Sequence, residues 1–345
     1  MARLSRYRIG EEDIDNAISE LVEMAKGREI NTDLVQEMIT SSIRMLRESN
    51  DRGDLKIANA ALKEMRYSFN VFESYRGQKK ASIFGSARTP EDHPLYELTR
   101  KLGAGLAKED WMVITGAGPG IMTAGIEGAG SEMSFGVGIK LPFESTTSQF
   151  ISGDPKLVNF RYFFTRKLMF MKESSGFILM PGGFGTMDEG FELLTLMQTG
   201  KMMSTPVVFL DEPNGTYWER FDEFIRGTLI QDNYVGENDL NLYLLAKTAE
   251  EAIEELKHFY ANYLSQRFVD GIMVLRMKRP ISDTALSSIN REFSDIITRG
   301  EIERCEISKD ELADKDNLNS HRLRFNFDKR HWASLRQIIN QINDF

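Results

Sequence analysis

Apolar residues recur at three- and four-residue spacing over the first part of the chain, beginning with Ile14, Ile18 and Leu21 and ending near Tyr75. Such spacing places these side chains on one face of a helix, so it predicts amphipathic helices. We therefore expect residues 1–79 to form a helical N-terminal extension.

From Lys80 to about Gln266, short apolar runs alternate with amphipathic stretches. The runs have the length of buried strands, and they are Ala81–Phe84, Trp111–Thr115, Phe135–Lys140, Phe177–Met180, Val207–Leu210 and Leu242–Ala246. Strands that alternate with helices indicate βαβ units. Residues 80–265 are therefore predicted to form an α/β domain with a parallel, doubly wound sheet.

The last part of the chain follows a third pattern, in which strand-like and helical stretches are mixed. They are a strand-like Gly271–Met277, a helix over Ser282–Ile297, a strand-like Ile302–Ile307, an alternating Arg322–Asp328 and a closing helix from His331. This order suits a small α+β appendage over residues 266–345.

The composition is that of a folded globular protein, with 41% hydrophobic and 28% charged residues. Cys305 is the only cysteine, so no intramolecular disulfide or Cys/His zinc site is expected and a reducing cytoplasm is the predicted location. No signal-peptide pattern is visible, and no apolar run approaches the ~20 residues of a membrane helix. The net charge of −9 argues against a nucleic acid polymer as partner.

Three predicted strands are followed by glycine-rich turns, at the carboxyl ends where open α/β sheets bind ligands. The first turn, Gly85-Ser86-Ala87-Arg88, would expose backbone N–H groups beside a hydroxyl and a guanidinium. A tight turn with a purely structural role is an equally good interpretation of this segment alone.

The second turn, Gly116-Ala117-Gly118-Pro119-Gly120-Ile121-Met122, opens a helix. Its glycines let the backbone approach a phosphate, and the helix N-terminus supplies free N–H groups. The dinucleotide fingerprint G-x-G-x-x-G is not met, because Ile121 stands at the third glycine position and Lys140 ends the next strand in place of an acid. No Gly-Lys-Ser/Thr follows either, so a generic phosphate or nucleotide cradle is favoured.

The third turn, Pro181-Gly182-Gly183-Phe184-Gly185-Thr186-Met187-Asp188-Glu189, runs from a strand into a helix. Thr186 and Glu189 have the spacing of a capping box, which is the structural alternative to a catalytic role. A carboxylate beside two phosphate-type turns is electrostatically unfavourable unless it takes part in chemistry. Upstream, Arg166 and Lys167 lie on a predicted helix, either as a solvated basic patch or as cations with an anionic partner.

Arg166-Lys167 followed by Pro181-Gly-Gly-Phe-Gly-Thr-Met-Asp-Glu189 resembles the paired motif of the LONELY GUY (LOG) family, whose members have also been labelled possible lysine decarboxylases. Gly85-Ser86 and the segment Gly116–Met122 match the family's other two nucleotide-binding turns. The resemblance covers about Lys80 to Ser265, and Ala117 and Pro119 stand where the family turn is often richer in glycine.

The resemblance implies a Rossmann-like doubly wound sheet and hydrolysis of the N-glycosidic bond of nucleoside 5′-monophosphates. The products are free base and ribose 5-phosphate, and the substrates include purine nucleotides such as AMP and cytokinin nucleotides. It implies that Arg166 and Glu189 are catalytic and that the enzyme is a homodimer or higher homo-oligomer. The implied substrate-binding residues are Gly85, Ser86, Arg88, Gly116, Gly118, Gly120, Met122, Lys167, Gly182, Gly183, Gly185 and Thr186.

The chemistry fits these residues independently. Cleavage of a glycosidic bond passes through an oxocarbenium-like state, which a carboxylate such as Glu189 can stabilise while it activates water. Arg166 can pair with Glu189, whose pKa a nearby cation would lower, or hold a ribose hydroxyl or the phosphate. The glycine turns would bind the 5′-phosphate and so position C1′. We expect neither a metal nor a cofactor, and residues of the Phe143–Val158 loop are expected near the base.

Two other functions use the same residues. A nucleotide sensor or cofactor carrier on the same fold would bind through the glycine turns and leave its ligand intact. A pyridoxal-dependent decarboxylase would need a Schiff-base lysine. Lys167 is the only lysine of the motifs, and its neighbour Arg166 would repel a substrate ammonium, so decarboxylation is disfavoured.

Overall fold

The computed structural model describes residues 7–25, 31–48, 51–140, 147–314 and 317–345. Its contacts divide the chain into two units, Met1–Arg66 and Tyr67–Phe345. The first unit contains α1 (Glu12–Met24), α2 (Thr32–Glu48) and most of α3 (Arg52–Glu73), and α1 packs on α2. Among the described helices, none combines the length and apolar character of a membrane span.

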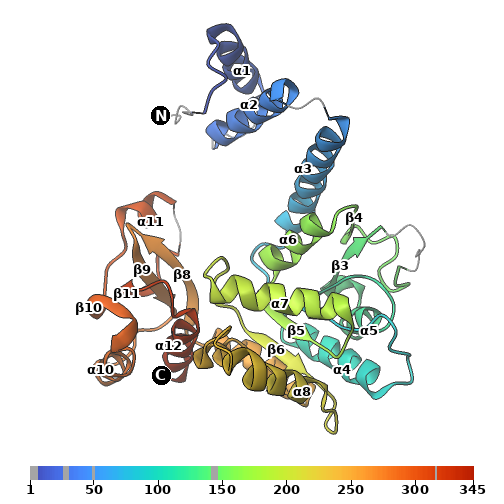
Figure 1. Ribbon diagram of the computed structural model, residues 1–345, viewed down its shortest axis with the longest axis vertical. Coiled ribbons are helices and arrows are strands. Elements are labelled where there is room, and N and C mark those ends of the chain that lie inside the picture. Colours follow the sequence, from blue (N-terminus) through green and yellow to red (C-terminus); the bar gives the residue numbers. More distant parts are fainter. Residues whose placement is uncertain (1–6, 26–30, 49–50, 141–146, 315–316) are drawn as a thin grey trace. The chain divides into compact units, whose positions relative to one another are not determined.

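The second unit is built on a seven-stranded parallel sheet in the order β4-β3-β2-β1-β5-β6-β7 (Figure 1). Its strands are β1 (Lys80–Phe84), β2 (Met112–Thr115), β3 (Ser134–Ile139), β4 (Leu157–Phe160), β5 (Gly176–Leu179), β6 (Val207–Leu210) and β7 (Leu244–Ala246). The predicted doubly wound α/β sheet is therefore confirmed. The edge strand β4 was not predicted, because Asn159 interrupts its short apolar run.

Helices cover both faces of this sheet. They are α4 (Pro94–Lys108), α5 (Ile121–Ala129), α6 (Phe163–Glu173), α7 (Phe184–Gln198), α8 (Tyr217–Phe224) and α9 (Ala249–Phe259). Neighbouring residues of a strand point to opposite faces. Ile83 accordingly packs in a buried cluster with α4, α5 and α9, whereas the ring of Phe84 lies 4.8 Å from that of Phe170 on α6. Shorter helical segments are η1 (Ser131–Met133), a π-helix η2 (Ile225–Ile230), η3 (Glu237–Leu242) and η4 (Ser294–Ile296).

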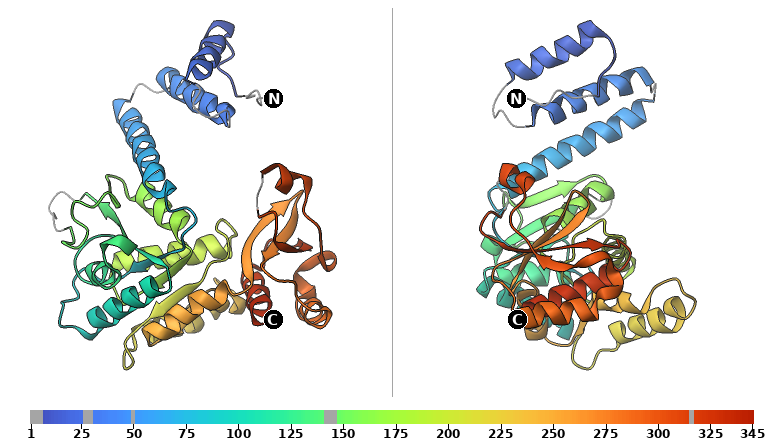
Figure 2. Two further views of the ribbon diagram at one scale, coloured as in Figure 1. Left: turned by 180° about the vertical axis from the view of Figure 1, so that it is seen from behind. Right: turned by 90° about the vertical axis from the view of Figure 1, so that its left-hand side faces the viewer.

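The C-terminal part forms a second, antiparallel sheet in the order β10-β11-β9-β8. Its elements are β8 (Tyr263–Val269), β9 (Ile272–Met277), α10 (Asp283–Glu292), β10 (Ile297–Arg304), α11 (Lys309–Asp314), β11 (His321–Phe327) and α12 (Trp332–Asp344). Residues of α10 and α12 share a buried cluster with β9 and β11, so both helices cover one face (Figure 2). The strand β8 crosses the predicted division at 265/266, and the domain boundaries of the sequence analysis stay predictions.

The closing helix α12 joins the two sheets. The side-chain oxygen of Asn343 accepts the backbone N–H groups of Asn262 (2.9 Å) and Tyr263 (2.8 Å). At the other end of the helix, Trp332 packs on Gly200, just beyond α7; a Cβ at this position would lie 2.0 Å from the indole. Gly200 also has a φ of +67°, so both its conformation and its contact require glycine.

Candidate active site

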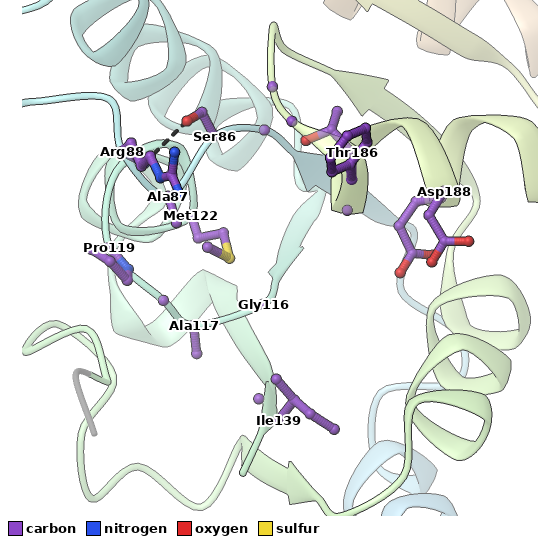
Figure 3. A pocket seen from close by; sticks show the side chains of 18 of the residues that line it. Ser86, Ala87, Arg88, Gly116, Ala117, Pro119, Met122, Ile139, Thr186 and Asp188 are labelled. Carbon is purple, nitrogen blue, oxygen red and sulfur yellow. Dashed lines mark hydrogen bonds between the residues drawn. The ribbon is translucent and has the colours of Figure 1, made fainter. Parts of the chain in front are cut away.

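The three glycine turns meet where the winding of the large sheet reverses. β1 and β5 are neighbours; β2, β3 and β4 continue on one side of this pair, and β6 and β7 on the other. Ligands of open α/β sheets bind at such a switch point, beyond the carboxyl ends of the strands. The turns after β1, β2 and β5 line one cavity of about 1240 Å³. Figure 3 shows Thr186 and Asp188 of α7 across this cavity from Ala117 and Pro119.

Backbone hydrogen bonds connect the three turns into one framework. The N–H of Ser86 donates to the carbonyl of Pro181 (3.2 Å), and the N–H of Ile121 donates to the carbonyl of Ser86 (3.1 Å). Gly120 has a φ of +66°, and a Cβ there would lie 2.4 Å from the Ser86 carbonyl oxygen. The first turn is therefore held between the other two, and Gly120 is needed for this close approach.

Two helix N-termini open toward the cavity without side-chain caps. α5 begins after Gly120 and α7 begins after Gly183, and neither residue offers a capping side chain. A Cβ built on Gly183 or Gly185 would meet nothing within 4 Å. The free N–H groups of a helix N-terminus and its dipole favour an anion, so these ends can receive a phosphate.

The capping-box interpretation of Thr186 and Glu189 is wrong. α7 begins at Phe184, so Thr186 lies inside its first turn, and its N–H donates to the carbonyl of Gly183 (3.1 Å). The Thr186 side chain lies against Gly182, where a Cβ would come within 2.1 Å of its hydroxyl oxygen. Glu189 therefore does not cap the start of α7.

Glu189 is a buried carboxylate with one unsatisfied oxygen. Its side chain is 8% exposed, and Oε2 has no hydrogen-bond partner in the described parts of the chain. Nζ of Lys167 lies 3.7 Å from Oε2. Burial raises the pKa of Glu189 from 4.5 to about 7, although Lys167 and Arg166 act to lower it. A carboxyl group that titrates near neutral pH is suited to proton transfer.

Arg166 and Lys167 have different environments, and neither is part of a solvated basic patch. Nε of Arg166 donates to the carbonyl of Val137 (2.8 Å), and its guanidinium occupies the space that a Cβ on Gly116 would fill, 2.4 Å from Nη2. Nζ of Lys167 pairs with Asp188 (2.9 Å) and Glu192 (2.6 Å). Within the described residues, no ion pair joins Arg166 to Glu189, so the first of the two roles considered for Arg166 is not seen.

Most of the residues predicted for the site lie together. Arg166 and Glu189 line the cavity, as do Gly85, Ser86, Arg88, Gly116, Gly118, Met122, Gly182, Gly183, Gly185 and Thr186. Two of the predicted residues do not line the cavity. Gly120 packs against the backbone of Ser86, and Lys167 lies beside Glu189. The roles assigned to these residues stay predictions.

Other lining residues were missed by the sequence analysis. Tyr217, at the start of α8, donates its hydroxyl to the carbonyl of Gly182 (2.5 Å). Asn159 on β4 and Phe163 on α6 also line the cavity. The signal for Tyr217 was available, since it follows β6, whose carboxyl end lies at the same edge of the sheet as that of β5. Of the loop expected near the base, residues 143–146 lie outside the described residues and Thr147 lines the cavity.

Comparison with known sequences supports the resemblance to the LOG family. The family model described as "Possible lysine decarboxylase" matches residues 120–256. The cytokinin riboside 5′-monophosphate phosphoribohydrolase LOG4 of Arabidopsis thaliana is 29% identical over 94 residues, which are 27% of this chain and 42% of that protein. LOG3 of the same plant matches with the same identity and coverage. The match spans less than half of these relatives, and the resemblance is confirmed at the level of the family.

Solved structures with a similar chain path include two molybdenum cofactor proteins. The molybdenum cofactor binding protein of Rippkaea orientalis has a TM-score of 0.38 and 20% identity, covering 52% of this chain and 96% of its own. The molybdenum cofactor carrier protein of Chlamydomonas reinhardtii has a TM-score of 0.36 and 21% identity, with the same coverage.

The burial of Glu189 predicts a pH-dependent effect of Glu189→Gln on stability. Between pH 5 and pH 8 the folded wild type must ionise a group whose pKa is about 7, against 4.5 when exposed, so the contribution of Glu189 to stability falls as the pH rises. At 1.36 kcal/mol per pKa unit, the variant should gain about 2 to 3 kcal/mol over the wild type in this interval. Urea unfolding at both pH values measures the gain.

Asp188→Asn is the matched control, because it neutralises a carboxylate that pairs with the same lysine but is 61% exposed. An exposed ion pair contributes about 0–1 kcal/mol, so its difference from the wild type should change little with pH. A Glu189→Gln difference that is the same at pH 5 and pH 8 would contradict the burial argument.

Proposed function

We propose that this protein hydrolyses the N-glycosidic bond of nucleoside 5′-monophosphates to free base and ribose 5-phosphate. The observation that carries this proposal is the buried, incompletely paired carboxylate of Glu189 in the same cavity as two uncapped helix N-termini. The carboxylate suits a sugar that becomes cationic in the transition state, and the helix N-termini suit a phosphate. The relatives named as phosphoribohydrolases of cytokinin riboside 5′-monophosphates support the same reaction class.

The phosphate is expected to bind at the glycine turns. Gly183 and Gly185 leave open space at the start of α7, where backbone N–H groups can donate to phosphate oxygens. Arg88 lines the same cavity and is exposed, so it adds a positive charge. Binding energy at the phosphate, remote from the reacting bond, then holds C1′ in place for the reaction.

The hydrolysis uses one water molecule. The C1′–N bond breaks, the base departs with the bonding electrons, and the sugar develops positive charge at C1′, which the Glu189 carboxylate stabilises. Glu189 takes a proton from the attacking water as the oxygen of this water bonds to C1′. The proton then passes from Glu189 to the departing base, which restores the carboxylate. Because its pKa is about 7, Glu189 can both accept and release this proton near neutral pH.

Arg166 is proposed to act on the ligand instead of on Glu189. It lines the cavity, and its Nε is already fixed by the Val137 carbonyl. The rest of the guanidinium therefore has a defined orientation for a ribose hydroxyl or a phosphate oxygen. Removal of Arg166 should accordingly weaken substrate binding and positioning together.

The decarboxylase label of the matched family receives no support from the lysine at the motif. Nζ of Lys167 pairs with Asp188 and Glu192 and lies 3.7 Å from Glu189. An ammonium held among three carboxylates remains charged, whereas a Schiff base requires a neutral amine. Lys167 also lies outside the cavity lining.

A homo-oligomer is part of the proposal. Large apolar side chains are exposed on α6 and α7, and they are Phe163, Phe164, Leu168, Phe184 and Phe191. Phe184 is 96% exposed at the rim of the cavity. Such patches on a protein surface commonly mark a subunit interface, which would then lie beside the site. A nucleotide substrate also fits the cytoplasmic location expected from the single cysteine.

Product analysis tests the proposed reaction. Wild type and Glu189→Gln are incubated with a panel of purine, pyrimidine and cytokinin nucleoside 5′-monophosphates, and free base and ribose 5-phosphate are separated by chromatography. We expect release by the wild type, and a loss of at least about a hundredfold in the variant, as for removal of a general acid or base. Tight binding without release would favour a nucleotide sensor or cofactor carrier.

Gly185→Ala should change stability and binding in opposite directions. Gly185 lies in the first turn of α7, where alanine favours the helix by up to about 1 kcal/mol, and its Cβ would contact no protein atom. The methyl group would instead occupy the space proposed for the phosphate. We expect unchanged or higher stability and at least about tenfold weaker binding of ribose 5-phosphate in calorimetry.

Gly227→Ala is the control for this substitution, since Gly227 lies in η2 and its Cβ would also meet nothing within 4 Å. It should leave ribose 5-phosphate binding unchanged. If Gly185→Ala binds ribose 5-phosphate as tightly as the wild type does, the phosphate does not lie at the start of α7.

A further inference from the structure

Tyr217 connects the end of one strand to the glycine turn of its neighbour. Tyr217 lines the cavity, and its hydroxyl donates to the carbonyl oxygen of Gly182 at 2.5 Å. Tyr217 begins α8, which follows β6, whereas Gly182 lies between β5 and α7. The hydrogen bond therefore connects the start of α8 to the glycine turn that is proposed to bind phosphate.

The peptide between Gly182 and Gly183 needs such a contact. Two consecutive glycines have no Cβ atoms to restrict their dihedral angles, so the peptide that joins them can rotate at small cost. In a trans peptide the carbonyl and the N–H point in opposite directions. Holding the Gly182 carbonyl toward Tyr217 therefore turns the Gly183 N–H to the other side of the turn.

The Gly183 N–H is available in this orientation. Among the described residues, no acceptor forms a hydrogen bond with it, and Gly183 itself is exposed and lines the cavity. It immediately precedes α7 as the N-cap residue. An anion at this helix end can accept a hydrogen bond from the Gly183 N–H. The direction of this N–H depends on the orientation of the Gly182–Gly183 peptide, whose carbonyl Tyr217 binds.

Tyr217 is itself rigidly placed. Its backbone N–H donates to Oδ2 of Asp211 (2.9 Å), a carboxylate that is 3% exposed at the end of β6. The next residue, Trp218, stacks on Phe209 of β6 with ring centroids 4.4 Å apart. Burial raises the pKa of Tyr217, so its hydroxyl keeps the proton that it donates. The start of α8, which carries Tyr217, is thus anchored to β6 and the residue that follows it.

We propose that Tyr217 is a positioning residue for the phosphate: its hydrogen bond to Gly182 sets the orientation of the Gly182–Gly183 peptide and presents the Gly183 N–H to the 5′-phosphate. This inference rests on the proposed function and assigns it a residue outside the matched motifs. The effect of Tyr217 on the reaction passes through the backbone of the turn and requires no contact with C1′.

Tyr217→Phe tests the role, because it removes the hydroxyl and keeps the ring. A net hydrogen bond corresponds to a factor of about three to ten in binding, so calorimetry should show ribose 5-phosphate binding weakened by that factor. KM for a nucleoside 5′-monophosphate should rise more than kcat falls. The preference for the nucleotide over its phosphate-free nucleoside, measured as the ratio of kcat/KM values, should fall by the same factor.

Tyr260→Phe is the matched control. Its hydroxyl also donates to a backbone carbonyl, that of Ser175 at 2.8 Å, beside the opposite end of β5. A general loss of structure would lower activity on nucleotide and nucleoside equally, whereas the loss of phosphate positioning lowers only the first. Tyr260→Phe should leave the ratio and the affinity for ribose 5-phosphate unchanged.

The outcomes separate this inference from the proposed function. If the wild type cleaves nucleotides and Tyr217→Phe keeps both its affinity for ribose 5-phosphate and its nucleotide preference, the role of Tyr217 is overturned while the function stands. If the wild type neither binds ribose 5-phosphate nor cleaves any nucleotide, both are overturned. Equal losses in Tyr217→Phe and Tyr260→Phe would also overturn the assignment.

Discussion

The burial of one carboxylate, Glu189, constrains the rest of the site. Ionising it inside the protein is unfavourable, as its pKa of about 7 indicates, and Lys167 compensates only in part from 3.7 Å. One oxygen has no hydrogen-bond partner in the described residues. Buried polar groups are normally satisfied, so such an exception points to a ligand or a reaction. Glu189 lies at the switch point of the sheet, beside two helix N-termini, which is where open α/β sheets bind their ligands.

The glycines of the three turns serve two different purposes. Gly116, Gly120 and Gly182 make room for protein groups, namely the Arg166 guanidinium, the Ser86 carbonyl and the Thr186 side chain. Gly183 and Gly185 face open space, so their lack of a side chain serves something other than the packing of the protein. One motif therefore contains glycines that make room for protein groups and glycines that face open space, and only contacts in three dimensions separate the two kinds.

The sheet and most of the site were predictable because their signals are local. Apolar runs marked six strands of the large sheet, and the glycine turns stood at the ends of three of them. The ion pairs of Lys167, the burial of Glu189 and the hydroxyl of Tyr217 depend on segments far apart in sequence. The capping-box alternative could not be decided from sequence, since Thr-x-x-Glu has the same spacing whether threonine caps the helix or, as here, lies within a helix that begins at Phe184.

The most direct test of the central claim is a crystal structure of the Glu189→Gln protein with a nucleoside 5′-monophosphate. The substitution should slow hydrolysis enough to trap the intact nucleotide. The structure should show the phosphate against the N–H groups at Gly183 and Gly185, and C1′ beside the side chain at position 189. A phosphate bound elsewhere, or a sugar whose C1′ faces away from position 189, would contradict the assignment of Glu189 to glycosidic cleavage.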